Sequence, residues 1–291
     1  MHPNVTAHRL LTDLLCTPVA MRGPDHLALV RAVEQARTSP AAALNLRSAL
    51  GDTAAPDGPA PWEKPLYKIE GGIATLAVSG PIVKGYDAIT CWYYGLCSTD
   101  ALADALDELA AMPEVSAVVF TFNSPGGCSA GMPEVAEQIV ALGQSKVTLA
   151  FVGDQACSNG YRLASACAMI LATKSATLGC IGTYIALYDY TEAMRAAGIK
   201  LELFAAGDYK GMGLEGNPIS DKQRAFLQAS VQRSNEMFTG FVRARRGDIA
   251  DETMQGQWFD GEEALALGLA DRLVSGLPEV LAELRGHLRP V

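Results

Sequence analysis

The chain has 291 residues, of which 49% are hydrophobic and 19% charged, so it can build a full globular core and is not a disordered chain. Its formal net charge of -9 argues against a nucleic-acid surface, which needs clustered Lys and Arg. No apolar run reaches the roughly 18–20 residues of a membrane span, and the N-terminus lacks the pattern of a signal peptide. These features predict a cytoplasmic protein with no nucleic-acid partner and no membrane anchor.

The cysteines and histidines limit the chemistry that the chain can perform. The seven Cys residues include no C-x-x-C pair, which argues against a zinc site of the usual spacing and favours reduced thiols. No histidine lies between His26 and His287. A nucleophile in the central part would therefore need a base other than histidine, and a Ser-Lys pair is a known arrangement. We expect neither a metal nor another cofactor.

Residues 1–62 are expected to form an N-terminal helical extension and a linker. Short helical patterns such as "LLTDLLC" come first. The stretch "GDTAAPDGPAP", from Gly51 to Pro61, is rich in the residues typical of a connecting segment. A separate folded unit is therefore expected to follow it.

From Tyr67 onward, apolar β-type runs alternate with amphipathic helical patterns. Ser98 or Thr99 is the expected N-cap of the first helix in this part. Strands that alternate with helices favour an α/β fold with a largely parallel sheet. Two strands are predicted within 67–80, one on each side of a Gly-Gly turn, and further strands at 116–122, 146–152, 200–206 and 271–274. Helices are predicted at 98–112 and 132–142, within 153–166, and at 191–198, 221–246, 261–270 and 277–288.

The segment "FTFNSPGGCSAG", Phe120 to Gly131, places a sharp turn at the end of a buried strand. Its adjacent glycines, Gly126 and Gly127, let backbone N–H groups approach a ligand without interference from a Cβ atom. Amides at the carboxyl end of a strand suit an oxyanion, although the same letters also fit a plain tight turn. There is no G-x-x-x-x-G-K-[ST] pattern, so this is not a Walker phosphate loop.

The segment "ACSNG", Ala156 to Gly160, resembles a nucleophile elbow, in which a serine follows a strand and precedes a helix. Ser158 would then lie at a helix N-terminus, where the helix dipole favours developing negative charge. The alternative is an ordinary small residue that packs the helix against the sheet. Cys157 is the rival nucleophile, but it has no histidine nearby, and we interpret it as a small buried residue.

A third segment, "LFAAGDYKGMGLEGNPIS" from Leu203 to Ser220, is a glycine-rich loop that follows an apolar run. It carries one lysine, Lys210, flanked by Tyr209 and Gly211. This lysine is either drawn into a pocket or an ordinary solvated side chain of a loop.

Together, in this order and spacing, several segments resemble the signal-peptide-peptidase-A-type serine proteases, and most closely their lambda-type phage capsid assembly (prohead) protease branch. The resemblance covers about Tyr67 to Ser275. It implies a crotonase- and Clp-protease-like β-β-α superhelix, with a Ser-Lys protease domain at 63–276 and a C-terminal helix at 277–291. The segments are "NSPGG", "CSNGYRLASA", "TLGCIGTYIALYDY", "AAGDYKGMGLEGNPIS" and "WFDGEEALALGLADRLV".

The resemblance also implies a role for each site residue. Ser158 matches the nucleophile and Lys210 the general base. Gly126, Gly127 and Asn159 provide the backbone that holds the oxyanion and the substrate strand. In the implied mechanism a neutral lysine takes the serine proton, the serine attacks a peptide carbonyl, and the lysine then protonates the leaving amine.

Two neighbours of the implied dyad bear on that mechanism. Family members commonly have "GSIG" where this chain has "GCIG", so Cys180 replaces a serine that helps to hold the base lysine. A thiol is a weaker hydrogen-bonding group than a hydroxyl. Asp208 is expected to face solvent, because a carboxylate in the pocket would favour the protonated lysine.

The implied function is that of a serine endopeptidase for phage capsid assembly, which cleaves scaffold or capsid-associated proteins in the host cytoplasm or inside the prohead. In family members the serine and lysine of one site can come from neighbouring subunits. We therefore predict a homo-oligomer in which Ser158 and Lys210 of one chain lie beyond hydrogen-bond reach. The alternatives are a soluble host-type signal peptide peptidase, a crotonase-like acyl-CoA enzyme, for which both loops lack a carboxylate base, and a catalytically decayed structural component.

Overall fold

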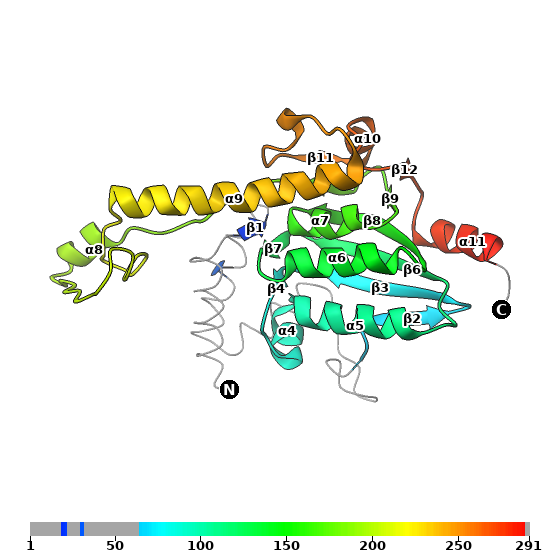
Figure 1. Cartoon of the computed structure of the whole chain (residues 1–291), viewed down its shortest axis with the longest axis horizontal. Helices are drawn as coiled ribbons and strands as arrows, with labels where there is room; N and C mark the ends of the chain where they lie inside the picture. Colours follow the sequence, from blue (N-terminus) through cyan, green and yellow to red (C-terminus); the bar gives the residue numbers. More distant parts are fainter. Residues whose placement is uncertain (1–18, 22–29, 32–63, 289–291) are drawn as a thin grey trace.

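The computed structural model describes residues 19–21, 30–31 and 64–288 (Figure 1). The helical extension and linker predicted for residues 1–62 lie outside these residues, apart from a strand at 19–21 and two helical residues, Val30 and Arg31. Within the described ranges, no helix combines the length and the apolarity that crossing a membrane requires.

Most of the strands form one eight-stranded sheet. They are β2 (Tyr67–Glu70), β3 (Ile73–Ser79), β6 (Ala117–Ser124), β8 (Val147–Cys157), β9 (Met169–Ala172), β10 (Thr177–Gly179), β11 (Trp258–Asp260) and β12 (Arg272–Leu273). β6 runs parallel to β3 on one side and to β8 on the other. β8 continues the parallel pairing with β9 through its middle residues and with β10 through its last residues. The central strands are buried on both faces, which is why they read as continuous apolar runs.

Helices cover both faces of this sheet (Figure 1). The helices with described bounds are α4 (Ala88–Tyr94), α5 (Thr99–Ala111), α6 (Met132–Leu142), α7 (Asn159–Ala166), α8 (Thr191–Ala196), α9 (Asp221–Arg246), α10 (Gly261–Ala266) and α11 (Leu277–His287), with a 3-10 turn η2 (Asp251–Thr253); α8 lies away from the sheet (Figure 1). α5, α6 and α7 pack on one face, where their apolar side chains and those of the sheet form the main core. α11 packs on the opposite face and buries Val280 and Leu284 against Val119 and Phe151.

Local signals in the sequence set several helix boundaries. The Oγ of Ser98 accepts a hydrogen bond from the backbone N–H of Ala101 at 3.3 Å, so Ser98 is the N-cap of α5. Ser220 and Gln223 form a capping box at the start of α9. The predictions for α5, α6, α9 and α11 are confirmed to within one residue at each end. The α/β fold with a largely parallel sheet is also confirmed.

A second, smaller sheet has the strand order β1-β7-β4-β5. Its strands are β1 (Val19–Met21), β7 (Gly126–Cys128), β4 (Ile82–Val83) and β5 (Cys97–Ser98). A Cβ atom on Gly127 would lie 2.0 Å from the carbonyl oxygen of Ile82, so only glycine allows β7 and β4 to approach this closely. The Gly126–Gly127 pair is therefore itself part of a short strand, which the sequence patterns did not reveal.

Residues 183–220, which we call the arm, extend away from the sheet at the N-terminal end of α9 (Figure 1). The arm contains α8, as predicted, but the strand predicted at 200–206 is wrong, because these residues have no strand conformation. The apolar side chains of Leu201, Leu203 and Phe204 are exposed. Without a neighbouring strand to pair with, an apolar run of this kind has no reason to adopt β structure.

Candidate active site

Ser158 lies where the central strand β8 turns into helix α7. Its side chain is 0% exposed, and its Oγ has no hydrogen-bond partner among the described residues. The backbone of Ser158 is held from both sides, because its N–H donates to the carbonyl of Gly179 at 2.7 Å and its carbonyl accepts from Arg162 at 2.9 Å. A buried hydroxyl without a partner costs free energy, so this arrangement is unusual for a purely structural serine.

The backbone at Ser158 adopts a conformation that few residues other than glycine adopt, with φ 55° and ψ -120°. Among the described residues, the one other non-glycine residue with positive φ is Cys180, with φ 51°. A conformation of this kind costs on the order of 1–3 kcal/mol and persists only where the surroundings enforce it. The sharp strand-to-helix turn is the geometry that presents a nucleophilic serine in an elbow.

Cys180 directly follows β10, the strand that pairs with the end of β8. Gly179 pairs in parallel register with Cys157, so the residues that follow them, Cys180 and Ser158, leave the same edge of the sheet together. The N–H of Cys180 donates to the carbonyl of Gln257 at 2.8 Å, which fixes this second strained residue from the side of β11. The two strained backbones are thus adjacent.

The Gly126–Gly127 turn is also brought to this edge of the sheet. The Oγ of Ser124 donates to the carbonyl of Gly80 at 2.7 Å and accepts from the N–H of Gly126 at 3.2 Å. The N–H of Gly126 is therefore already engaged, and an oxyanion would have to compete for it. Sequence reasoning missed Ser124, although a serine two residues before a glycine pair is a recognised turn-forming position.

Asn159, the first residue of α7, ties the turn to the serine. Its Nδ2 donates to the carbonyls of Gly127 at 3.2 Å and of Cys128 at 2.7 Å. The first N–H groups of a helix have no partner within the helix, so the backbone of Asn159 is a further candidate oxyanion donor. A Cβ atom on Gly160 would lie 3.1 Å from the carbonyl of Ser124, so the small residue after Asn159 permits this close approach.

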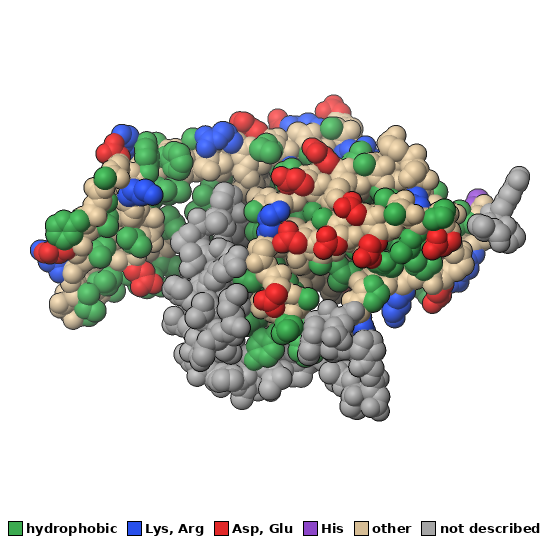
Figure 2. Space-filling model, turned by 60° about the horizontal axis from the view of Figure 1, so that its bottom comes forward, with side chains coloured by type: hydrophobic (Ala, Val, Ile, Leu, Met, Phe, Trp, Pro, Cys, Tyr) green, Lys and Arg blue, Asp and Glu red, His purple; other side chains and the backbone are tan. Residues whose placement is uncertain are grey.

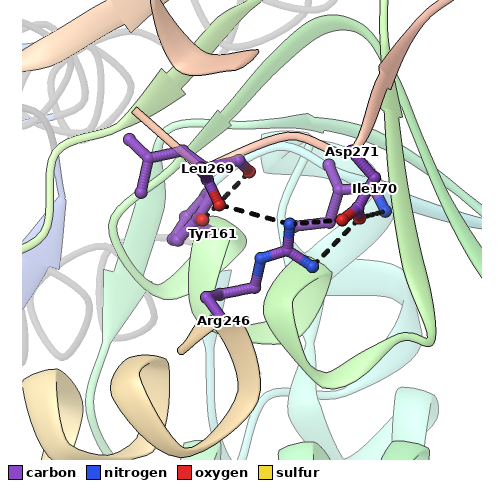
Figure 3. A network of polar contacts seen from close by, with 6 residues as sticks. Tyr161, Ile170, Arg246, Leu269 and Asp271 are labelled. Carbon is purple, nitrogen blue, oxygen red and sulfur yellow. Dashed lines mark hydrogen bonds and ion pairs between the residues drawn. The ribbon is translucent and has the colours of Figure 1, made fainter. Parts of the chain in front are cut away.

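Helix α7 is fixed in place by a buried polar network at the C-terminal end of α9 (Figure 3). The hydroxyl of Tyr161 donates to the carbonyl of Leu269 at 3.0 Å, and burial raises the pKa of Tyr161. Arg246 forms an ion pair with Asp271 at 2.8 Å. Asp271 also accepts from the N–H of Ile170 at 2.7 Å. These contacts join α7, β9 and α9, and so hold the helix that begins next to Ser158.

Arg162 joins α7 to the middle of α9. Its guanidinium lies 5.5 Å from the ring centres of both Phe238 and Phe241, within the range of a cation–π contact. It also donates to the carbonyl of Met237 at 3.3 Å. Burial lowers the pKa of Arg162. The helix that leads to the arm is therefore anchored one turn away from Ser158 along α7.

Lys210 is not brought to Ser158 within one chain. It is exposed in the arm, and its ammonium makes no hydrogen bond or ion pair with the described residues. The adjacent Asp208 is tied to the start of α9, because its carbonyl accepts from the Nε2 of Gln223 at 2.6 Å. Between Gln223 and Met237 the helix rises by about 20 Å, at 1.5 Å per residue. Lys210 therefore lies near the N-terminal end of α9, whereas α7 contacts the C-terminal half of that helix.

Asp208 faces solvent, as expected from the sequence. Its carboxylate pairs with Lys222, and this hydrogen bond lowers the pKa of Asp208. Cys157, the rival nucleophile, is buried and directs its Sγ to the carbonyl of Thr177 at 3.9 Å. Among the described residues, no group of three or more His, Cys, Asp or Glu side chains is placed to hold a metal ion.

Solved structures with a related arrangement include an enoyl-CoA hydratase/isomerase family protein from Silicibacter pomeroyi. It is 18% identical, with a TM-score of 0.44 over 76% of this chain and 80% of that chain. An enoyl-CoA hydratase from Shewanella pealeana is 12% identical, with a TM-score of 0.42 over 77% of this chain and 74% of that chain.

Curated relatives include two phage proteins and a plant protease. Capsid assembly protease C of Escherichia phage lambda is 31% identical over 75% of this chain and 50% of its own length. Head-tail preconnector protein GP5 of Enterobacteria phage P21 is 29% identical over 72% of this chain and 42% of its own length. Serine protease SPPA, chloroplastic, of Arabidopsis thaliana is 25% identical over 74% of this chain and 31% of its own length. The chain thus spans half or less of the length of these relatives.

The sequence of this chain also matches a protein-family model. Peptidase family S49 matches residues 141–288, just over half of the chain. The matched region begins before β8 and includes Ser158, Cys180, the arm with Lys210, and α9. By this match, the chain belongs to peptidase family S49.

Proposed function

We propose that this protein is a serine endopeptidase in which Ser158 is the nucleophile. The observation that carries the proposal is the buried hydroxyl of Ser158, which has no partner in the described part of the chain and lies on a strained strand-to-helix turn, in a chain of peptidase family S49. Strain and unsatisfied polar groups collect at catalytic positions, where the substrate or a second catalytic group completes the site. A serine that served only to pack α7 against the sheet would need neither feature.

In the proposed reaction, a neutral Lys210 accepts the proton of Ser158, and the Oγ attacks the carbonyl carbon of a peptide bond. The negative charge on the carbonyl oxygen is stabilised by amides of the Gly126–Gly127 turn and of Asn159, close to the N-terminus of α7. The ammonium of Lys210 then protonates the leaving amine, and an acyl ester remains on Ser158. Water hydrolyses the ester, with the lysine as base again.

The lysine of each site is proposed to come from the arm of a neighbouring subunit. Among the described residues, the hydroxyl of Ser158 has no partner, and neither has the ammonium of Lys210 at the other end of α9, so each lacks what the other supplies. A contact in which the arm of one chain reaches the α7 edge of the next would complete both groups. Because the two contact surfaces differ, such contacts generate a ring when the rotation closes.

The surface of the arm supports a protein contact. Figure 2 shows hydrophobic side chains gathered at the end of the molecule that carries the arm. Phe204 is 92% exposed, and large exposed apolar residues of this kind mark interaction sites when they cluster. The other large, exposed apolar residues of the arm are Tyr188, Tyr190, Ile199, Leu201, Leu203, Tyr209 and Leu214. We propose a second copy of the chain as the occupant.

The proposed substrates are proteins, bound in extended form. Two relatives carry names that refer to phage capsid assembly and to a head-tail preconnector, and we extend that setting to this chain as a proposal. The substrates would then be scaffold or capsid-associated proteins. In this proposal residues 63–276 act as the protease domain, residues 1–62 as an extension, and residues 277–291 as a C-terminal helix.

The test uses a serine-directed fluorophosphonate probe and a peptide library whose cleavage is followed by mass spectrometry. Ser158→Ala should lose probe labelling and reduce peptide cleavage by a factor of about 10⁴ or more. Thermal melting of the same samples should show an intact fold. Cys157→Ser is the matched control and should keep both signals. Cleavage retained by Ser158→Ala would remove this serine from the mechanism.

A further inference from the structure

Strand β7, which contains the Gly126–Gly127 pair, is flanked on one side by the N-terminal strand β1 of the same chain. β7 lies between β4 and β1 in the smaller sheet (Figure 1). Without β1, β7 would be an edge strand with unpaired N–H and C=O groups. Such an edge is a template on which an extended peptide can add a strand.

This edge lies next to the candidate nucleophile. The side chain of Asn159, directly after Ser158, bonds to the carbonyls of Gly127 and Cys128. A peptide that pairs with β7 would therefore run past the start of α7. The strand β1, formed by Val19–Met21, is located along this path.

β1 runs along β7 in the direction expected for the part of a substrate that precedes the cleaved peptide bond. The pairing is antiparallel, with Val19 opposite Cys128, Ala20 opposite Gly127 and Met21 opposite Gly126. From N to C, β1 therefore runs along β7 from Cys128 to Gly126, and its last two residues lie opposite the two glycines assigned to the oxyanion. A substrate strand in this position would deliver the carbonyl at its C-terminal end to the same turn.

We propose that Val19–Met21 is an internal competitor, which occupies the substrate-strand position on β7 and must leave before a protein substrate binds. This inference rests on the proposed function, because it takes β7 as the substrate-binding strand. It assigns a regulatory role to the N-terminal segment: the site is closed while β1 is paired and open when β1 is displaced. An intramolecular strand competes at the high effective concentration that a covalent connection provides.

The first experiment measures binding without catalysis, in the full chain with Ser158→Ala. The probe is a fluorescent peptide with the sequence Thr17–Arg22, "TPVAMR". The added double substitution Ala20→Pro and Met21→Pro removes two backbone N–H donors from β1. Because adjacent residues of an antiparallel strand alternate between bonded and non-bonded positions, one of the two prolines must remove a ladder donor.

We expect the double-proline chain to bind the peptide at least about ten-fold more tightly, because the competing strand no longer reduces the fraction of open sites. The matched control, Ala20→Ser with Met21→Leu, keeps both N–H groups and should bind as weakly as the unsubstituted chain. Equal affinity in all three proteins would overturn the proposal. Failure of the folded proline variant to bind at all would also overturn it, since β7 would then have no free edge for a peptide.

The second experiment measures catalysis with Ser158 intact. A competing internal strand predicts that the double-proline variant has a lower KM and an unchanged kcat for a reporter peptide, because saturating substrate displaces β1 in either protein. An unchanged KM, or a loss of kcat in a folded variant, would contradict an inhibitory role. If the proline variant binds the peptide more tightly but no variant cleaves any peptide, the proposed protease function fails and the competition by β1 stands.

Discussion

The two ends of helix α9 are held in opposite ways. Its C-terminal part is in the main core, where Phe238 and Val242 are buried, and Arg246 pairs with Asp271 beside α7. Its N-terminal part carries the exposed Phe226 and contacts the loop of the arm, as in the ring contact between Phe226 and Tyr209 at 5.0 Å. One helix thus connects the rigid region around Ser158 to a region with little core of its own.

This difference matches what each proposed catalytic group needs. Ser158 is held in a strained conformation, which requires packed surroundings that fix its backbone from every side. Lys210 is on a surface that is incomplete alone, because a single chain gives its ammonium no partner among the described residues. If neighbouring chains complete the site, assembly controls activity: an isolated subunit would carry both groups and remain inactive.

Among the variants that compare the two ends of α9, the largest expected effect is that of Lys210 in the arm. Lys210→Ala and Lys210→Arg should both reduce peptide cleavage by about 10²–10⁴-fold, because neither side chain can accept the serine proton. The melting temperature should not change, since Lys210 is exposed.

Lys200→Ala is the matched control for this comparison. Lys200 is also an exposed lysine of the arm, and its ammonium pairs with Glu202 at 2.8 Å. Its removal should leave the steady-state rate of cleavage nearly unchanged. An active Lys210→Arg variant would exclude Lys210 as the base.

The next effect concerns the apolar surface of the arm. Phe204→Ser should weaken self-association, because burying a Phe side chain is worth about 1.5–3 kcal/mol, or roughly 10- to 150-fold in a dissociation constant. Analytical ultracentrifugation should show smaller species, and activity per subunit should fall and recover as protein concentration rises. Leu265→Ser, an exposed apolar position on α10, should leave the sedimentation unchanged. The same assembly in both variants would place the subunit contact elsewhere.

The smallest effect compares two ion pairs, one at each end of α9. Arg246→Met removes a charged partner whose side chain is 7% exposed, and should lower the free energy of unfolding by about 1.5–3 kcal/mol. Lys222→Met removes the exposed pair with Asp208 in the arm and should not change it measurably. Urea unfolding at one fixed protein concentration provides the measurement. Equal losses would mean that the two ends of α9 are equally well anchored.

Much of the main sheet and its helices could be predicted from the sequence, because these elements carry strong local signals. β6 and β8 are continuous apolar runs, and α5 and α9 begin at residues whose side chains cap them. The strand prediction at 200–206 is wrong because an alternating apolar pattern indicates positions that are buried. It does not specify whether a neighbouring strand or another protein covers them.

The smaller sheet could not be predicted, for a different reason. β7 is "GGC", which has no β propensity, and it exists because Ile82 and Val19–Met21, both distant in sequence, pair with it. The candidate serine was found from its strand-to-helix position. The contacts of Ser124 with Gly126 and of Ser158 with the carbonyl of Gly179 were not predicted. They depend on strand register, which a sequence motif does not specify.

Mixing two inactive variants tests whether one site takes its serine and its lysine from different chains. Ser158→Ala and Lys210→Ala subunits are co-expressed with different tags, and oligomers that carry both tags are purified. If each site joins two subunits, random 1:1 mixing places an intact serine opposite an intact lysine in about a quarter of the sites. We therefore expect about a quarter of the unsubstituted activity in mixed oligomers. No recovery in oligomers shown to contain both subunits would contradict it.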